Sequence, residues 1–231
     1  MANTYLVSTV KPWNLAAFER WRPKLTGNWL AVCDRADLSE AVVGTLNPRY
    51  IFFPHWSWIV PKEILSIAEC VCFHMTDVPY GRGGSPLQNL IARGKKSTVV
   101  SALRMVPELD AGPVYLKCDL DLSGSAESVF ERAAELIFHM ADEIARNEPE
   151  PVPQEGEPVV FPRRTPAESV LPGEGSLEAV YDHVRMLDAE TYPRAYMNHG
   201  DFRIEFRNAS LRDDAVECEV TIKQGGGNAD E

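Results

Sequence analysis

The sequence predicts an α/β protein with a Rossmann-like core, in which helices flank a mostly parallel sheet, and a small C-terminal appendage of helix and strands. Short continuous apolar runs alternate with amphipathic segments of helical spacing as far as residue 147. Such runs are typical of parallel strands that are buried on both faces. The composition then changes at Glu148, where a proline-rich segment begins. A chain of 231 residues with 45% hydrophobic content can bury one ordinary core beside an appendage.

Six apolar runs are predicted to form the strands of the main domain. Each is short, rich in β-branched or aromatic residues, and bounded by polar or turn residues. They lie at 4–10, 28–34, 49–56, 69–75, 97–106 and 112–122.

The segments between these runs have helical spacing and are predicted to cover the sheet. They lie at 14–25, 39–46, 61–68 and 85–94. A long helix is predicted to begin at Ser125, which can cap its N-terminus, and to end near residue 147. Glu127 adds an acid to its first turn, where the helix dipole favours negative charge.

These patterns predict four parts of the chain. The segment after residue 147 holds seven prolines and no periodicity, which is typical of an extended linker. The helix at 176–190 and the strands at 202–207 and 215–223 are predicted to form a small subdomain, whose strands pair within one chain or across a homodimer. The predicted parts are a main domain at 1–147, a linker at 148–175, a helix and β-hairpin at 176–223, and a flexible tail at 224–231.

Composition narrows the classes of partner and location. The formal net charge of −11 disfavours long nucleic acid, because phosphate backbones repel an acidic surface. The N-terminus resembles no signal peptide, and no stretch approaches the roughly 20 apolar residues that span a bilayer. The five cysteines form no CxxC pair, which predicts reduced thiols and no metal site. We therefore expect a cytoplasmic protein without membrane or nucleic-acid partners.

Two polar residues are predicted to meet at one edge of the sheet. His74 ends the run "ECVCFH", and Asp110 follows the run at 97–106 in a turn-forming "LDAGP" segment. Ligands of open parallel sheets bind outside the carboxyl ends of the strands. A carboxylate that meets an imidazole there can fix its tautomer and stabilise its charged form. Each residue alone also has a structural explanation, as a buried histidine or a turn aspartate.

The joint pattern of these residues resembles the folate-dependent formyltransferases. This family includes enzymes that act on glycinamide ribonucleotide, methionyl-tRNA and nucleotide-linked amino sugars. The family has an Asn-x-His, a Leu-Pro and Arg-Gly turn leading into a helix, and an Asp in a later loop. His74, Pro79, Arg82, Gly83 and Asp110 fall on those positions, and the aspartate follows the histidine at a spacing of 36. The likeness extends over residues 49–147 and is weaker over the first fifty.

The resemblance implies one-carbon transfer from 10-formyltetrahydrofolate at a catalytic centre of His74, Asp110 and Cys72, without a metal. The segment "IFFPHWSWIVPKEIL" resembles the family strand and loop that border the folate pterin. The implied folate-binding residues are Trp56, Ser57, Trp58, Ile59, Val60, Pro107, Glu108 and Leu109.

Cys72 departs from the family pattern, which has an asparagine at this position. In the family that amide helps to polarise the formyl oxygen, and a thiol is a much weaker donor. His55 and Ser57 on the neighbouring loop are alternative donors. A packed thiol, a formyl-cysteine intermediate and a non-catalytic folate-binding relative all remain open.

The acceptor is expected to be the amine of a nucleotide-linked amino sugar or a related surface-glycan precursor of the nonulosonic acid type. The region from Glu190 has five basic and nine acidic residues, whereas a tRNA-binding domain is expected to be basic. Arg163 and Arg164 are expected to bind a phosphate through forked hydrogen bonds, with Arg82 and Gly83 also at the substrate. Formylation of an amino acid or a hydroxylamine is the alternative.

Overall fold

The computed structural model describes residues 3–225, which divide into two compact units. The first unit holds the described part of Met1–Pro86 together with Thr98–Leu120 and Phe130–Phe161. The second holds Leu87–Ser97, Asp121–Val129 and the described part of Pro162–Glu231. The boundaries proposed at 147 and 175 stay a prediction, and residues 226–231 of the proposed tail lie outside the described residues.

The central sheet of the first unit has six strands in the order β2-β1-β3-β4-β6-β7. Four neighbours, β2, β1, β3 and β4, run parallel, which confirms the predicted α/β class with a mostly parallel sheet. The strands of this sheet are β1 (Thr4–Ser8), β2 (Asn28–Val32), β3 (Tyr50–Phe53), β4 (Glu69–His74), β6 (Ser97–Arg104) and β7 (Val114–Asp121).

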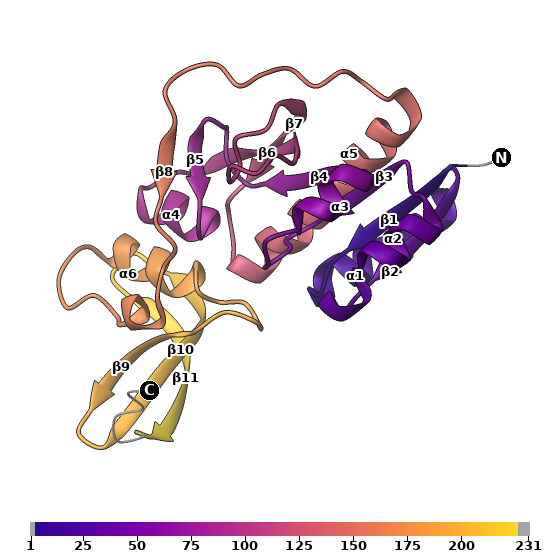
Figure 1. Cartoon of the computed structure of the whole chain (residues 1–231). Helices are drawn as coiled ribbons and strands as arrows, with labels where there is room; N and C mark the ends of the chain where they lie inside the picture. Colours follow the sequence, from indigo (N-terminus) through magenta and orange to yellow (C-terminus); the bar gives the residue numbers. More distant parts are fainter. Residues whose placement is uncertain (1–2, 226–231) are drawn as a thin grey trace. The chain divides into compact units, whose positions relative to one another are not determined.

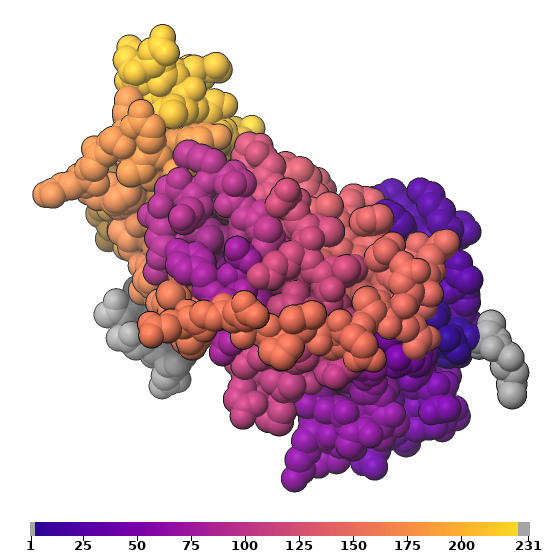
Figure 2. Space-filling model, turned by 90° about the horizontal axis from the view of Figure 1, so that it is seen from above, coloured from indigo at the N-terminus to yellow at the C-terminus, as the bar shows by residue number. Residues whose placement is uncertain are grey.

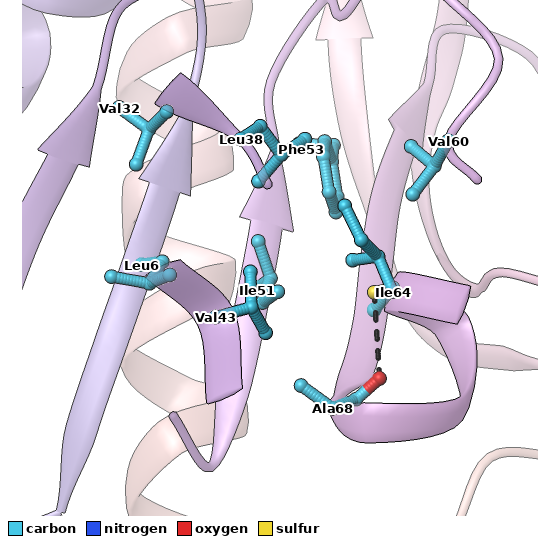
Figure 3. Close-up of a cluster of buried hydrophobic side chains, with 10 residues drawn as sticks. Leu6, Val32, Leu38, Val43, Ile51, Phe53, Val60, Ile64 and Ala68 are labelled. Atoms are coloured by element: carbon cyan, nitrogen blue, oxygen red, sulfur yellow. Dashed lines mark hydrogen bonds between the residues drawn. The ribbon is translucent and has the colours of Figure 1, made fainter. Parts of the chain in front are cut away.

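Helices cover both faces of this sheet (Figure 1). On one face α2 (Glu40–Leu46) and α3 (Lys62–Ile67) enclose a buried apolar cluster with the strands (Figure 3). Its members are Leu6, Val32, Leu38, Val43, Ile51, Phe53, Val60, Ile64, Ala68 and Cys70. Because side chains alternate along a strand, Leu6 faces this cluster and its neighbour Tyr5 faces the opposite side.

The opposite face packs against α1 (Pro12–Trp21) and α5 (Ala126–Asn147). Phe18 of α1 meets Phe138 of α5 with ring centroids 5.8 Å apart. Tyr5 donates its hydroxyl to the carbonyl of Ala145 across 3.1 Å. The predicted cap of α5 is present, since the Oγ of Ser125 accepts the backbone N–H of Ser128 at 3.3 Å. Short 3₁₀ turns follow α1 at Arg22–Lys24 and β2 at Arg35–Asp37.

One strand of the sheet runs against the others. β6 pairs antiparallel with β4, so that Val71 faces Arg104 and His74 faces Ser101. The carboxyl end of β6 therefore lies beside the beginning of β4. The expectation that β4 and β6 end at the same edge is wrong, because a continuous apolar run does not specify strand direction.

The proline-rich segment is ordered and supplies a strand to the first unit. β8 (Val159–Phe161) pairs parallel with β5 (Tyr80–Gly83), which lies in the glycine-rich turn. Upstream of β8, Val152 forms an isolated antiparallel bridge with Val114. Figure 2 shows the segment as an orange band across the surface of the molecule.

The second unit combines helices with an antiparallel sheet of order β11-β10-β9. The elements are α4 (Pro86–Ala92), the 3₁₀ turn Pro166–Ser169, α6 (Leu177–Arg185), β9 (Ala195–His199), β10 (Phe202–Leu211) and β11 (Val216–Gln224). The predicted strands correspond to β10 and β11, whereas β5, β8 and β9 were not predicted. Among residues 3–225 the structure has no helix long and apolar enough to cross a membrane.

Candidate active site

His74 lies at the carboxyl end of β4, where one ring nitrogen makes a hydrogen bond and the other faces a carboxylate. Its Nε2 lies 2.7 Å from the carbonyl oxygen of Gly81. A carbonyl can only accept, so this nitrogen carries a proton and donates it. Its Nδ1 lies 3.6 Å from Oδ2 of Asp110, which is outside hydrogen-bond range but close for a pair of charges. Nδ1 therefore faces Asp110. It carries a lone pair when the ring is neutral and a second proton when the ring is charged.

Asp110 reaches His74 from a loop that turns back from the end of β6. The N–H of Arg104 donates to the carbonyl of Pro113 at 2.9 Å, which closes this loop at its base. Asp110 itself has φ +52°, an uncommon conformation for a residue with a side chain. Its Oδ2 accepts the backbone N–H of Gly83 at 2.9 Å. The loop thus brings the carboxylate between the imidazole and the glycine-rich turn.

The glycine-rich turn takes its shape from close packing against β8. Gly81 has φ +80°, and a Cβ added there would lie 2.7 Å from Thr76 and 2.8 Å from the ring of Phe161. Only glycine fits both the conformation and the space. The next glycine, Gly84, donates its N–H to the carbonyl of Phe161 at 3.0 Å. The carbonyl that holds His74 is therefore fixed by a strand from the proline-rich segment.

Arg82 is engaged within the first unit. Its Nε and Nη2 donate to Oε1 of Gln154 at 3.0 and 2.7 Å. The Nε2 of Gln154 donates to the carbonyls of Asp110 and Gly112, both at 2.8 Å. The predicted roles of Arg82 and Gly83 at a substrate stay predictions. In the structure Arg82 contacts Gln154, and Gly83 contacts Asp110.

Cys72 lies two residues before His74 on the same strand, so both side chains point to the same face of the sheet. Burial raises the pKa of the Cys72 thiol, and the negative charge of Asp110 raises it further. The thiol is therefore protonated at neutral pH and is a poor nucleophile. This environment favours the packed thiol over a formyl-cysteine intermediate.

His55 is a neutral, fully engaged side chain beside the pair. The indole Nε1 of Trp13, which can only donate, lies 3.2 Å from its Nδ1, so Nδ1 accepts and Nε2 carries the proton. That Nε2 lies 3.2 Å from the sulfur of Met75. Burial lowers the pKa of His55 to about 4, and the charges of Lys11 and His74 act in the same direction. His55 therefore has no free proton to replace the missing amide at Cys72.

The predicted folate loops expose apolar side chains. Ile59 is 82% exposed and Leu109 is 63% exposed, both in loops of the first unit. The indole nitrogen of Trp56 is buried without a hydrogen-bond partner, while Ser57 is exposed. Val60 differs from these, because it is buried in the apolar cluster and can meet a ligand only through its backbone. The other predicted folate residues in the second loop, Pro107 and Glu108, are exposed.

Arg163 and Arg164 belong to the second unit. Arg163 is exposed, and Nη2 of Arg164 donates to the carbonyl of Glu168 at 2.5 Å. Their predicted binding of a phosphate stays a prediction. Within residues 3–225, no three side chains of His, Cys, Asp or Glu are grouped so that they could hold a metal ion.

Two residues that contact the site were not predicted from the sequence. Gln154 and Phe161 both come from the segment that its prolines identified only as a linker. The apolar run "VVF" at 159–161 was too short to predict a strand.

The fold and the His74–Asp110 pair together define a Rossmann-like α/β protein with a histidine–aspartate site at the end of a central strand. A solved structure described as methionyl-tRNA formyltransferase from Clostridium thermocellum is 43% identical, with a TM-score of 0.94, and the match covers 96% of this chain and 100% of that one. The chain belongs to the formyltransferase family. In agreement, the family model described as methionyl-tRNA formyltransferase, C-terminal domain, matches residues 166–223.

Two further comparisons set the limits of this likeness. A methionyl-tRNA formyltransferase of Sulfurihydrogenibium sp. (strain YO3AOP1) is 26% identical over 78% of this chain, which spans 59% of that relative's length. A sugar N-formyltransferase from Shewanella sp FDAARGOS_354 shares the fold, with a TM-score of 0.70, but is only 13% identical.

These comparisons correct the predicted acceptor. The assignment to a nucleotide-linked amino sugar is wrong, because the relatives of higher identity are named methionyl-tRNA formyltransferases. The exclusion of nucleic-acid partners is wrong for the same reason. Net charge averages over many residues, whereas recognition of a phosphate depends on the charges near it. Neither the charge of −11 nor the acidic region from Glu190 was therefore sufficient ground for these predictions.

Proposed function

We propose that this chain transfers the formyl group of 10-formyltetrahydrofolate to the amino group of methionyl-tRNA. The proposal depends on one geometric observation, the approach of His74 Nδ1 to the Asp110 carboxylate at 3.6 Å beside the glycine-rich turn. Family membership and the names of the relatives supply the donor and the acceptor.

The donor supplies an activated formyl carbon, and transfer replaces its bond to the folate nitrogen with a bond to the acceptor amine. One proton must leave the amine and one must reach the folate nitrogen. The Nε2–H of His74 is committed to the carbonyl of Gly81, so the exchange of protons falls to Nδ1. A proton on Nδ1 can also stabilise negative charge on the formyl oxygen. The distance of 3.6 Å from Nδ1 to Asp110 leaves the Nδ1 proton available to a reacting atom.

The residues of the first unit fit a flat, partly polar donor. Exposed Ile59 and Leu109 offer apolar contact beside the half-buried indole of Trp56. Trp56 and Trp58 lie edge to face with centroids 4.9 Å apart and add a rigid aromatic border.

The basic side chains of β10 and β11 are relevant to how the acceptor is bound. Arg207 of β10 pairs with Glu219 of β11, and Arg212, in the turn after β10, pairs with Glu217. Lys223 of β11 pairs with Glu205 of β10. These cations are already neutralised, so we propose that recognition depends on the aminoacyl end more than on many phosphates. Charged tRNA is a cytoplasmic acceptor, and the proposal therefore retains the cytoplasmic location expected from the sequence.

The test is to incubate the chain with 10-formyltetrahydrofolate and methionyl-tRNA. Mass spectrometry should detect N-formylmethionine on the tRNA, with one tetrahydrofolate released for each formyl group. Uncharged tRNA and free methionine serve as matched controls. Binding of folate without transfer to any of these acceptors contradicts the proposal, and release of tetrahydrofolate without an amine indicates hydrolysis instead.

A further inference from the structure

Gln154 joins Arg82 of the glycine-rich turn to the loop that carries Asp110, and so adds to the bond between Asp110 and Gly83. Its carboxamide oxygen accepts two hydrogen bonds from Arg82, at 3.0 and 2.7 Å. Its nitrogen donates to the carbonyls of Asp110 and Gly112, both at 2.8 Å. Gln154 stands in the segment between α5 and β8, and its side chain is half-buried against the first unit.

The chemistry of the partners gives this carboxamide one orientation. A guanidinium can only donate and a carbonyl can only accept, so the oxygen of Gln154 must face Arg82 and the nitrogen must face the loop. A carboxylate in place of Gln154 would have no N–H to donate to the two carbonyls. An apolar side chain could bond neither to Arg82 nor to the carbonyls. Arg82 therefore determines which end of Gln154 meets the loop that carries Asp110.

The bonds from Gln154 fall where the backbone of the loop needs support. Asp110 has φ +52°, and such conformations persist in residues with side chains when the surroundings hold them. Two hydrogen bonds to the carbonyls on either side of Ala111 hold the backbone in this turn. The same conformation points the carboxylate at the N–H of Gly83, at 2.9 Å, and at Nδ1 of His74.

We infer that Gln154 is a positioning residue that holds the carboxylate of Asp110 against His74, and that Arg82 acts by orienting Gln154. The part of this inference that concerns catalysis rests on the proposed function. The proline-rich segment then contributes directly to the geometry of the site. Its residue Gln154 bonds to the backbone of Asp110, and its residue Phe161 bonds to the turn that holds His74.

Amide hydrogen exchange tests the geometry without any activity measurement. Gln154→Glu keeps an acceptor for Arg82 but places an oxygen against the two loop carbonyls, so the loop should shift and release the N–H of Gly83. Its exchange should become roughly tenfold faster or more. The N–H of Gly84 is the internal control, because it donates to the carbonyl of Phe161. Gln154→Ala tests the loss of both contacts, and Glu155→Gln, at the exposed neighbouring position, is the matched control variant.

Kinetics test the consequence for the reaction. Misplacement of a reacting group by about 1 Å can cost on the order of 100-fold. Gln154→Glu should therefore lower kcat by about 10- to 100-fold and leave the folate KM within about twofold. Unchanged exchange of Gly83, equal acceleration of Gly83 and Gly84, or faster exchange of Gly83 with wild-type kcat would each overturn the inference. If the wild-type chain transfers no formyl group, the proposed function fails, and the selective response of Gly83 alone decides the positioning role.

Discussion

The carboxylate of Asp110 accepts the backbone N–H of Gly83 across 2.9 Å, although 27 residues separate them in the chain. The same oxygen, Oδ2, also lies 3.6 Å from Nδ1 of His74. One carboxylate oxygen thus joins the loop after β6, the glycine-rich turn and the end of β4. The arrangement holds the acid and the imidazole in one geometry.

Removal of either member of the pair should slow formyl transfer by about 10²–10⁴, the usual range for loss of an acid–base group. His74→Asn keeps a side-chain donor for the carbonyl of Gly81, so the fold should survive. Asp110→Asn keeps an oxygen for the N–H of Gly83 and removes the charge. Single-turnover rates with folate donor and methionyl-tRNA measure both variants. His199→Asn, at an exposed position in β9, should transfer at the wild-type rate. Near-normal rates for both site variants would exclude the mechanism.

Replacement of the Cys72 thiol should change the transfer rate little, whereas loss of a catalytic nucleophile would abolish transfer. Because the thiol is protonated and packed, Cys72→Ala should change the transfer rate by less than about tenfold, a small loss beside the ~2.7–4 kcal/mol of an oxyanion donor. Cys72→Asn restores the family amide and should keep or raise the rate. A collapse of activity in both variants, with a formyl thioester trapped on the wild-type chain, would show covalent catalysis instead. Cys33→Ala, at an exposed cysteine, controls for general effects.

The free energy of unfolding should fall as the pH drops from about 6.5 to about 4 because of His55. Burial holds its folded pKa at about 4, below the ordinary value of 6.5, so the unfolded chain binds a proton that the folded chain does not. The contribution of His55 is full above pH 6.5 and decreases through this window, by on the order of 2 kcal/mol between pH 7 and pH 5. Urea unfolding should show a flatter pH dependence in His55→Gln. Equal slopes for this variant and wild type would contradict the assignment.

Glu69 should control stability in a more acidic range. Burial alone raises its pKa, but hydrogen bonds from Arg49, Tyr115 and Arg104 lower it below the ordinary value of 4.5. Since the folded pKa is depressed, its contribution is present above pH 4.5 and is lost as the pH falls through the folded pKa. Glu69→Gln should lower the free energy of unfolding by about 1–3 kcal/mol at pH 7. It should also weaken the dependence on pH below 4.5. Loss of stability that is equal at all pH values would indicate packing rather than charge.

Truncation of Phe161 should destabilise the first unit far more than truncation of its neighbour. The ring is 1% exposed and packs edge to face on Tyr80, with centroids 5.2 Å apart. Phe161→Ala should cost about 3–5 kcal/mol, the usual range for a buried aromatic side chain. Val160→Ala is the matched control, because that side chain is 70% exposed and should change stability by less than about 0.5 kcal/mol. Equal urea midpoints for the two variants would show that β8 does not stabilise the turn.

Local sequence patterns predicted much of the architecture correctly. The apolar runs correspond to β1, β2, β3, β4, β6 and β7, and the helical spacing corresponds to α1 to α6 within a few residues. Burial on both faces makes the central strands β1, β3 and β4 largely apolar along their length, and this pattern is visible in the sequence. The motif around His74 and Asp110 likewise indicated the family, since residue type, order and spacing are all properties of the chain itself.

The direction of β6, the strand at Val159–Phe161 and the role of Gln154 became apparent only in the folded structure. An apolar run reads the same in parallel and antiparallel neighbours, and three residues of strand carry too little periodicity to be recognised. The position of Asp110 depends on hydrogen bonds from a side chain 44 residues away. The residue types at the site are thus properties of the sequence, whereas their geometry comes from long-range contacts that no local pattern encodes.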